Sequence, residues 1–329
     1  MKITPIDLRK LEERTPLHQV IPLSAPFSLY LEPTSHCNLG CKFCPTGHRH
    51  LRNRRLNGLM GFGLFRKIVD DIKQFDHKLK RINLYKDGEP LLHKQFPEMV
   101  RYLKDADVVD TIWVKTNGVP LDPELNARLA DCGLDFIGVS INGVDASSYL
   151  DVTQRHIDYD KLVDGVADLF SRPRTCKIYV KIVDSGLTPE QIDKFYADFT
   201  PISDYIAVEY LHGWSASDTM DFRLGTNADT FEGAPLVEKI ACPLPFFMLG
   251  INWSGTVSLC NEDWAHGTLV GDLMQESLMD IWNGERLRAM RRMHLEGRRS
   301  ENPMCGNCHY LTTLPDNIDP WREELLERL

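Results

Sequence analysis

Three cysteines near the start of the chain have a spacing that suits a metal cluster. Cys37, Cys41 and Cys44 lie within eight residues, directly after a short β-branched and aromatic run. Three thiolates can converge on one iron–sulfur cube, which normally takes four cysteine ligands. A missing fourth ligand leaves one iron open to a chelating small molecule, as in catalytic rather than structural metal sites. The alternative is a zinc site completed by His36 or His48.

Four more cysteines lie in the C-terminal quarter of the chain: Cys242, Cys260, Cys305 and Cys308. Four thiolates satisfy a whole [4Fe–4S] cube and leave no open position. The same set, with its CxxC pair, suits structural zinc about equally well on spacing alone. Gly255 precedes Cys260 by five residues and predicts a hairpin there.

Length, charge and hydropathy narrow the class of protein. The chain has 329 residues and a formal net charge of -9. This charge argues against a nucleic-acid partner, because such proteins usually carry a basic face. No apolar run reaches the roughly 20 residues of a membrane span, and the polar N-terminus does not resemble a signal peptide. We therefore expect a cytoplasmic protein without membrane contact, whose nine cysteines bind metal or catalyse rather than form disulfides.

The elements that must position these cysteines alternate along the chain. The expected strands are 27–32, 81–85, 111–115, 136–140, 177–183 and 205–210. The expected helices are 95–104, 123–130, 159–170 and 189–199, preceded by one whose apolar face carries Phe65, Ile68, Val69, Ile72 and Phe75. This alternation predicts an α/β fold with a parallel sheet, a partial (β/α)6 barrel of the TIM type. The three-cysteine loop then falls at the C-terminal ends of the strands, where such barrels bind ligands.

The chain divides into five expected segments. They are an N-terminal extension (1–26), the partial barrel (27–210), a linker or loop (211–241), a small α+β domain with the second cysteine set (242–312) and a C-terminal helix (313–329). In the fourth segment we expect strands at 247–253 and 256–259, then one amphipathic helix over 277–294.

The first cysteine loop resembles the CxxxCxΦC signature of the radical S-adenosylmethionine (SAM) superfamily, with Phe43 as its aromatic residue. Residues 87–90, Asp-Gly-Glu-Pro, resemble the family's GGEP motif, with Asp87 in place of the first glycine. Residues 116–118 and 140–143 resemble further motifs of this family, and four motifs in order after candidate strands are a strong signal. The resemblance implies that the open iron binds SAM. It also implies these SAM-binding residues: Phe43, Gly88, Glu89, Pro90, Thr116, Asn117, Ser140, Asn142 and Arg155.

Residues 255–308 resemble the shortened SPASM module called a twitch domain. This resemblance implies a second [4Fe–4S] cluster on the four C-terminal cysteines. The cysteine spacing and the segments at 261–264, 270–273 and 277–282 are especially similar to the 2-deoxy-scyllo-inosamine dehydrogenases of aminoglycoside biosynthesis. The barrel resembles those enzymes by motif only, and its extra loop between 210 and 242 argues for a different substrate.

The resemblance implies a radical oxidation in natural-product (antibiotic) biosynthesis. A reduced cluster cleaves SAM to methionine and a 5′-deoxyadenosyl radical, which abstracts hydrogen from a carbinol carbon of a carbohydrate or aminocyclitol. A base takes the hydroxyl proton, the second cluster accepts an electron, and the product is a ketone. The candidate catalytic residues are Lys86, Glu262 and Asp263. The expected electron donor is a flavodoxin or ferredoxin.

Three alternatives remain open. Epimerisation would need a hydrogen donor, but Cys132 and Cys176 map to the N-terminal rim of the barrel, where buried structural thiols are expected. A ribosomal-peptide-modifying enzyme would carry a leader-binding domain and more cysteines, whereas only 26 residues precede the first expected strand. An electron carrier or zinc-stabilised binding module would leave the SAM motifs without a purpose.

Several polar residues at strand ends are candidates for substrate contact. Lys115, Lys181 and Asp184 follow this pattern, although the lysines would equally pair with carboxylates. Tyr210, His212 and Trp214 could line a sugar-sized pocket. The basic run at 48–55 is either an anion site or, more often for such runs, a solvated loop.

Overall fold

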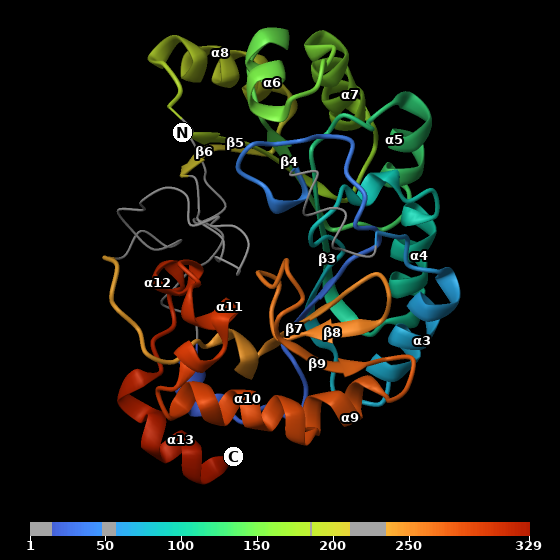
Figure 1. The fold of residues 1–329 in the computed structure, drawn as a ribbon. Helices are drawn as coiled ribbons and strands as arrows, with labels where there is room; N and C mark the ends of the chain where they lie inside the picture. Colours follow the sequence, from blue (N-terminus) through green and yellow to red (C-terminus); the bar gives the residue numbers. More distant parts are fainter. Residues whose placement is uncertain (1–14, 48–56, 185, 211–234) are drawn as a thin grey trace.

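One nine-stranded sheet runs through this computed structural model, which describes residues 15–47, 57–184, 186–210 and 235–329 (Figure 1). Its strand order is β6-β5-β4-β3-β2-β1-β7-β8-β9. The first six strands are parallel: β1 (Ser28–Leu31), β2 (Leu79–Asn83), β3 (Val109–Thr116), β4 (Phe136–Ile141), β5 (Lys177–Asp184) and β6 (Tyr205–Tyr210). Each strand pairs with the next one along the chain, which confirms the predicted partial (β/α)6 barrel.

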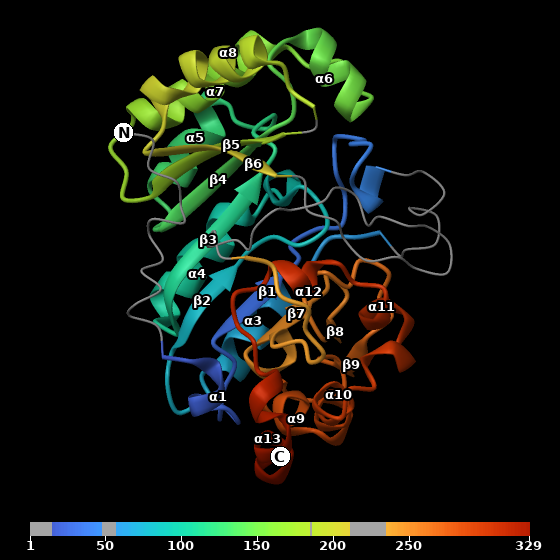
Figure 2. The ribbon, with the colours of Figure 1, turned by 90° about the vertical axis from the view of Figure 1, so that its left-hand side faces the viewer.

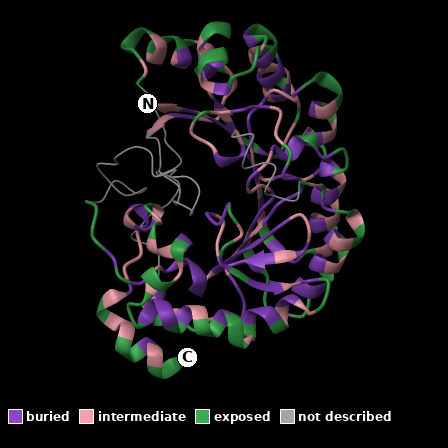
Figure 3. Ribbon diagram, viewed as in Figure 1, coloured by how far each residue is buried: buried purple, intermediate pink, exposed green. Residues whose placement is uncertain are grey.

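Helices cover the outer face of these strands (Figures 1 and 2). They are α3 (Phe62–Ile72), α4 (Phe96–Ala106), α5 (Pro123–Ala130), α6 (Ala146–Thr153), α7 (Tyr159–Ser171) and α8 (Pro189–Phe199). Helices α3, α4 and α7 bury apolar stripes, as Phe65 and Ile68 of α3 show. Helix α3 ends before Phe75, which is nevertheless buried. Figure 3 shows buried strands and exposed outer helix faces.

Local capping explains where several helices begin. Thr188 accepts a hydrogen bond from the Gln191 amide and Gln191 caps in return, with Pro189 in the first turn of α8. Such a cap stabilises a helix by about 1 kcal/mol. Asp145 and Ser148 form the same capping box at the start of α6, a helix that the sequence analysis did not expect. Its serines, threonine and short length hide the helical period.

The C-terminal segment extends the sheet of the barrel. Strand β7 (Met248–Ile251) pairs in parallel with β1, and β8 (Thr256–Ser258) and β9 (Leu269–Asp272) follow as antiparallel strands. The free edge of β1 is thereby covered. The predicted hairpin is present, and Gly255 turns it with φ +95°, a value that favours glycine.

The prediction of a single helix over 277–294 was wrong, because the structure has two helices there. Helix α9 (Leu278–Asn283) and helix α10 (Glu285–Leu295) are separated by Gly284, whose backbone is extended at φ -75° and ψ 158°. A Cβ at Gly284 would lie 2.7 Å from the Asp280 carbonyl oxygen, and glycine is a poor helix former.

Short helices complete the described chain. They are α1 (Leu17–Val20), α11 (Pro303–Gly306), α12 (Tyr310–Thr313) and α13 (Arg322–Arg328), with 3-10 turns η3 (Pro45–Gly47), η4 (Pro90–Leu92), η5 (Thr200–Ile202), η6 (Leu244–Phe246), η7 (Arg299–Glu301) and η8 (Asp319–Trp321). The C-terminal helix predicted over 313–329 is confined to α13, which packs near α1 through buried Leu17 and Leu325. None of the helices in the described ranges has the length and apolarity needed to cross a membrane.

Candidate functional site

The three-cysteine loop follows β1 and is folded tightly on itself. The Cys44 amide donates to the Cys41 carbonyl at 3.1 Å, and the Gly47 amide donates to the Cys44 carbonyl at 2.9 Å. A Cβ at Gly47 would lie 2.2 Å from the Cys41 oxygen, so only glycine fits this turn. The loop therefore gathers Cys37, Cys41 and Cys44, each half-buried, around one place.

The end of α6 holds this loop against the barrel. The Gly40 amide donates to the Thr153 carbonyl at 2.8 Å, and the Lys42 amide donates to the Val152 carbonyl at 3.0 Å. The Gln154 side chain returns a hydrogen bond to the Gly40 carbonyl at 2.9 Å. The helix that the sequence analysis missed is thus the one that positions the predicted metal ligands.

The thiols of the first set suit a shared cation. Burial raises the pKa of Cys41 well above its usual value, and the neighbouring Cys44 and Cys37 raise it further. Burial also raises the pKa of Cys44, whose sulfur lies 3.0 Å from the Thr46 hydroxyl. Thiols with raised pKa values favour the protonated form, and binding of a metal ion would displace these protons. Three such donors, without a fourth cysteine in the loop, fit a cube with one open iron.

The Asp-Gly-Glu-Pro segment after β2 is bound to both neighbouring strand ends. The buried Glu89 carboxylate accepts hydrogen bonds from the Thr116 hydroxyl at 2.7 Å, the Asn117 amide at 2.6 Å and the Leu91 amide at 3.0 Å. Burial raises the pKa of Glu89 to about 7, although these hydrogen bonds lower it. A Cβ at Gly88 would lie 2.2 Å from the Thr34 carbonyl oxygen, which explains glycine there.

The other predicted SAM residues lie at the ends of β3 and β4 and on the loops beside them. The Asn117 side chain donates to Asn38 at 2.7 Å and lies 3.9 Å from the Cys37 sulfur. The Asn142 side chain donates to the Ser140 carbonyl at 3.2 Å. Phe43 is half-buried, whereas Arg155 is exposed and donates to the Gln154 carbonyl. Gly88, Glu89, Pro90, Thr116, Asn117, Ser140 and Asn142 therefore share the barrel end that holds the cysteine loop, and their SAM contacts stay a prediction.

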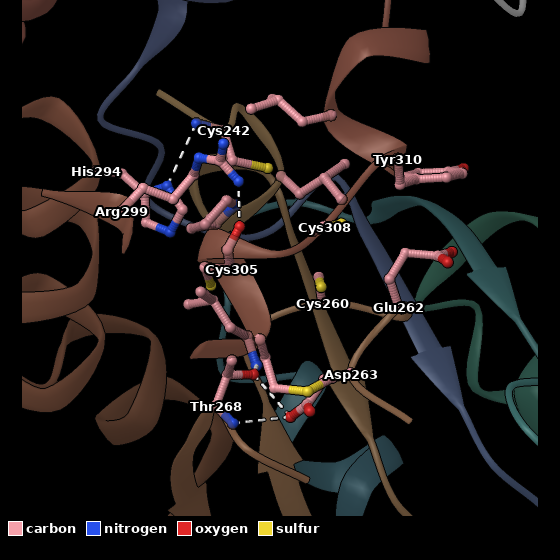
Figure 4. Close-up of a pocket in the computed structure, with 15 residues that line it drawn as sticks. Cys242, Cys260, Glu262, Asp263, Thr268, His294, Arg299, Cys305, Cys308 and Tyr310 are labelled. Atoms are coloured by element: carbon pink, nitrogen blue, oxygen red, sulfur yellow. Dashed lines mark hydrogen bonds between the residues drawn. The ribbon is translucent and has the colours of Figure 1, made fainter. Parts of the chain in front are cut away.

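The four C-terminal cysteines line a single pocket (Figure 4). Cys242 precedes η6, Cys260 follows β8, Cys305 lies in α11 and Cys308 precedes α12. The remaining lining residues are Leu244, Pro245, Leu259, Glu262, Asp263, Thr268, His294, Arg299, Met304, Tyr310 and Leu311. Figure 4 shows the four sulfur atoms facing a common centre.

The same thiol chemistry appears here with four donors. Burial raises the pKa of Cys305 to about 12 and that of Cys308 to about 11. Burial raises the pKa of Cys260 well above its usual value, and each of the other three cysteines raises it further. Four half-buried thiols, whose thiolate forms would repel one another, fit a cluster that neutralises all four and keeps no open position.

Two polar side chains border this pocket beside the thiols. His294 accepts a hydrogen bond from the Cys242 amide through Nδ1 at 3.3 Å, and Arg299 donates to the Cys305 carbonyl. Burial, with a smaller effect of Arg299, lowers the pKa of His294 to about 4. The sequence analysis singled out neither residue, since neither belongs to a motif.

Lys86, which follows β2, and Glu262 and Asp263, which line the pocket of the four cysteines, have different environments. Lys86 pairs with Asp87 at 2.5 Å and donates to the Asp263 carbonyl at 3.0 Å. The Asp263 carboxylate accepts from the Gly267 amide at 2.8 Å and the Thr268 hydroxyl at 2.7 Å, which fixes the turn after the second cluster ligand.

Glu262 differs because its carboxylate is bonded by the Asn261 side chain and turns away from the four sulfurs (Figure 4). Burial raises the pKa of Glu262 to about 7; Asp87 adds to this shift, while Lys86 and Lys115 oppose it. Lys86 is held in an ion pair and Asp263 is bonded by backbone amides. In the described chain, the Glu262 carboxylate has neither kind of contact.

A polar layer lies on the inner face of the barrel above an aromatic floor. Trp113, Phe136, Tyr179, Ala207 and Tyr205 form this floor. Alternation along the strands puts Lys115, Lys181 and Glu209 on the same face, two residues further on.

The charges of this layer are only partly paired. Lys181 pairs with Glu209 at 2.5 Å, as one alternative for that lysine predicted, and the Tyr179 hydroxyl donates to Glu209 at 2.6 Å. Burial alone would raise the pKa of Glu209, but Lys181 and Lys115 lower it to about 2. Lys115 contacts the Tyr85 ring at 5.6 Å and, in the described chain, has no hydrogen-bonded acceptor.

Other predicted residues fall elsewhere. Asp184 accepts from the Gly186 and Leu187 amides and so shapes the turn after β5. Cys132 and Cys176 are buried, and burial raises the pKa of Cys132 to about 11. His48, the basic run at 48–55, the Tyr210 side chain, His212, Trp214 and most of the expected linker lie outside the described residues.

Comparison with known proteins gives the class that the fold and the cysteine sets define. A model of the radical SAM superfamily matches residues 31–198, and a model of the SPASM iron–sulfur cluster-binding domain matches residues 242–309. The first match spans half of the chain. The protein therefore belongs to the radical SAM superfamily. Its cofactors are SAM and a [4Fe–4S] cluster, with auxiliary iron–sulfur cluster binding in the SPASM domain.

Individual relatives differ in what they catalyse. The chain is 36% identical, over 39% of its length, to the tungsten-containing aldehyde ferredoxin oxidoreductase cofactor-modifying protein of Pyrococcus furiosus, and 34% identical, over 49%, to GTP 3′,8-cyclase of Chlorobaculum tepidum. These alignments cover only 34% and 46% of those relatives. The SAM-dependent 2-deoxy-scyllo-inosamine dehydrogenase of Niallia circulans aligns over 85% of this chain and 91% of its own length at 23% identity.

Solved structures agree on the fold. The crystal structure of BtrN in complex with AdoMet and 2-DOIA gives a TM-score of 0.55 over 86% of this chain and 92% of its own, at 18% identity. SuiB of Streptococcus suis bound to S-adenosylmethionine gives 0.65 over 92% and 75%, at 15% identity. At these identities the likeness shows the fold alone.

Proposed function

We propose that this protein oxidises a secondary alcohol of a carbohydrate or aminocyclitol to a ketone. The observation that carries the proposal is the pair of cysteine sets, one with three thiols and one with four, in a chain whose barrel strands and C-terminal strands form one sheet. When bound, SAM and the first cluster supply a hydrogen-abstracting radical, and the second cluster supplies a one-electron acceptor. The carbinol carbon thus loses a hydrogen atom and an electron, and its hydroxyl loses a proton.

The polar layer inside the barrel supports a small polar substrate. Lys115 offers an ammonium group without an acceptor in the described chain, and the Lys181–Glu209 pair retains side-chain exposures of 14% and 27%. The neighbouring Tyr85 ring suits the apolar face of a sugar-like ring. Hydroxyl groups of the substrate can accept from the lysines and donate to Glu209.

Glu262 is the residue that we propose as acceptor of the hydroxyl proton. Its carboxylate turns away from the four sulfurs, and Lys115 of the inner layer is near enough to lower its pKa. Lys86 and Asp263 instead hold the loop after β2 and the turn after Cys260 in place. This oxidation removes a proton and an electron from one carbinol group, so a proton acceptor close to the electron acceptor suits it.

The dehydrogenase relative supports this reaction over the alternatives. Its alignment extends over most of both chains, whereas those with the cofactor-modifying protein and the cyclase cover less than half of each. Buried Cys132 and Cys176 argue against a thiol that returns hydrogen to a substrate radical. We therefore place the protein in natural-product biosynthesis, with a flavodoxin or ferredoxin as its reductant.

The decisive experiment uses protein reconstituted anaerobically with iron and sulfide. It is incubated with SAM, a reductant and a panel of aminocyclitols and sugars, and 5′-deoxyadenosine and ketone are measured by mass spectrometry. We expect one ketone per SAM consumed for the accepted substrate. Uptake of solvent hydrogen at the same carbon, with no ketone, would instead identify an epimerase and refute the proposal.

A further inference from the structure

His294 presents a buried N–H group at the pocket of the four C-terminal cysteines. The residue is 1% exposed and lies in α10. Because Nδ1 accepts from the Cys242 amide at 3.3 Å, a neutral ring carries its proton on Nε2. In the described chain, Nε2 is buried and has no hydrogen-bond partner. A buried donor without an acceptor is destabilising, so such a group calls for an acceptor that occupies the pocket.

Arg299 brings a positive charge to the same pocket. Its guanidinium donates to the Cys305 carbonyl oxygen, and no ion pair joins it to a carboxylate within the described ranges. Figure 4 shows Arg299 and His294 on the side of the pocket formed by Cys242 and Cys305. The guanidinium lowers the pKa of Cys242, Cys305 and Cys308, against the larger effect of burial, so its field reaches these thiols.

These two groups act differently on the two oxidation states of an iron–sulfur cluster. Sulfide and thiolate sulfurs accept hydrogen bonds, and reduction adds one negative charge to the cluster. An N–H donor and a nearby cation therefore stabilise the reduced state more than the oxidised state, most strongly where water is excluded. Both effects raise the reduction potential.

We propose that His294, through Nε2–H, and Arg299 act on the sulfurs of the second cluster and raise its reduction potential, which makes it an electron acceptor. The two residues tune the potential of the cluster from outside its ligand set and do not bind iron themselves. The inference uses the predicted four-cysteine ligand set but does not depend on the proposed substrate or on alcohol oxidation.

The test measures a potential and needs no substrate. Full-length protein with Cys37, Cys41 and Cys44 replaced by alanine retains the second set alone, and its reconstituted cluster is titrated under EPR detection. We expect His294→Phe to lower the reduced-to-oxidised ratio at a fixed potential about tenfold, a shift of about 59 mV for a one-electron couple. Arg299→Met should shift the potential in the same direction. His294→Gln, which keeps a donor and an acceptor, should restore most of the change.

Matched controls exclude effects of any substitution near the cluster. His309 follows Cys308 directly but is exposed, and Arg298 is an exposed neighbour that pairs with Glu296. We expect His309→Phe and Arg298→Met to leave the potential unchanged. A fully loaded His294→Phe variant with the parent potential would overturn the role of His294.

A second measurement covers the case in which His294→Phe does not bind iron. The parent protein is labelled with nitrogen-15 histidine and its reduced second cluster is examined by pulsed EPR. We expect a histidine nitrogen coupled weakly to the cluster, and we expect His309→Phe to retain that coupling. Absence of any histidine coupling in the loaded parent would also overturn the inference.

Discussion

The buried ion pair between Lys86 and Asp87 allows a specific prediction of how substitutions change the free energy of unfolding. The two side chains are 0% and 1% exposed, and Nζ lies 2.5 Å from the carboxylate oxygen. Lys86 also donates to the Asp263 carbonyl, so the pair connects the loop after β2 to the turn that follows Cys260. We consider the substitutions Asp87→Asn and Lys86→Met and their combination.

The size of the effect follows from the distance and the burial. At an effective dielectric constant of about 20, two unit charges 2.5 Å apart attract by about 7 kcal/mol. Desolvation of both ions offsets much of this attraction, so the whole pair contributes little. Removal of one partner is expensive, about 3–5 kcal/mol, because the other charge stays in a buried place. We expect each single variant to lose about this much free energy of unfolding and the double variant to lose clearly less than their sum.

The assay is a double-mutant cycle from urea unfolding of the anaerobically loaded protein, with a common m value. The exposed pair of Lys73 and Asp70 is a matched control, since its atoms are 2.8 Å apart but its side chains are 48% and 60% exposed. We expect Asp70→Asn to cost less than about 1 kcal/mol. Single-variant losses at the buried pair as small as this control, or losses that simply add in the double variant, would refute the reasoning.

Three further predictions concern the two cysteine sets and the inner layer. Alanine at Cys37, Cys41 and Cys44 together should abolish 5′-deoxyadenosine formation while leaving the second set loaded, as measured by iron analysis; continued SAM cleavage would contradict the site. Glu262→Gln should slow ketone formation about 10²- to 10⁴-fold, the usual contribution of a general base, in single-turnover mass spectrometry, and a rate close to wild type would remove it from the reaction. Lys115→Met should raise KM about ten- to a hundredfold with little change in kcat, since a hydrogen bond to a charged group contributes about 1.5–3 kcal/mol, and an unchanged KM would exclude Lys115 from substrate contact.

Much of the barrel could be predicted because its strands and amphipathic helices follow clear periods. The strand 205–210 and the helices 123–130 and 189–199 were predicted with the bounds that the structure gives. Capping residues with a clear sequence signature, such as Thr188 before Pro189, explain why the first residue of the helix was predicted correctly. The break at Gly284 was missed because apolar residues occur on both sides of it, although the step of five residues from Trp282 to Leu287 departs from the helical period. Helix α6 was missed because only Tyr149 and Thr153 are buried on it.

The cysteine sets could be predicted because a metal cluster fixes residue type and spacing. The residues around them could not, since they come from distant elements. His294 and Arg299 reach the pocket from α10 and η7, which carry no motif. Glu209 was missed, although a carboxylate two residues after Ala207 on a barrel strand marks the inner face. Alternation within strands is thus the signal that would have found the inner layer.

The parallel pairing of β7 with β1 has a consequence for how the molecule can be divided. From Ser28↔Met248 to Leu31↔Ile251, the strand that leads to the three-cysteine loop is hydrogen-bonded to β7, and the other side of β7 pairs with β8, the strand that precedes Cys260. The three-cysteine loop and the loop with Cys260 therefore both follow strands of one continuous sheet, and an interdomain hinge does not set their separation. A truncated chain that ends before residue 242 would leave the backbone of β1 unmatched along that side, and we expect it to self-associate rather than behave as an independent SAM-cleaving module.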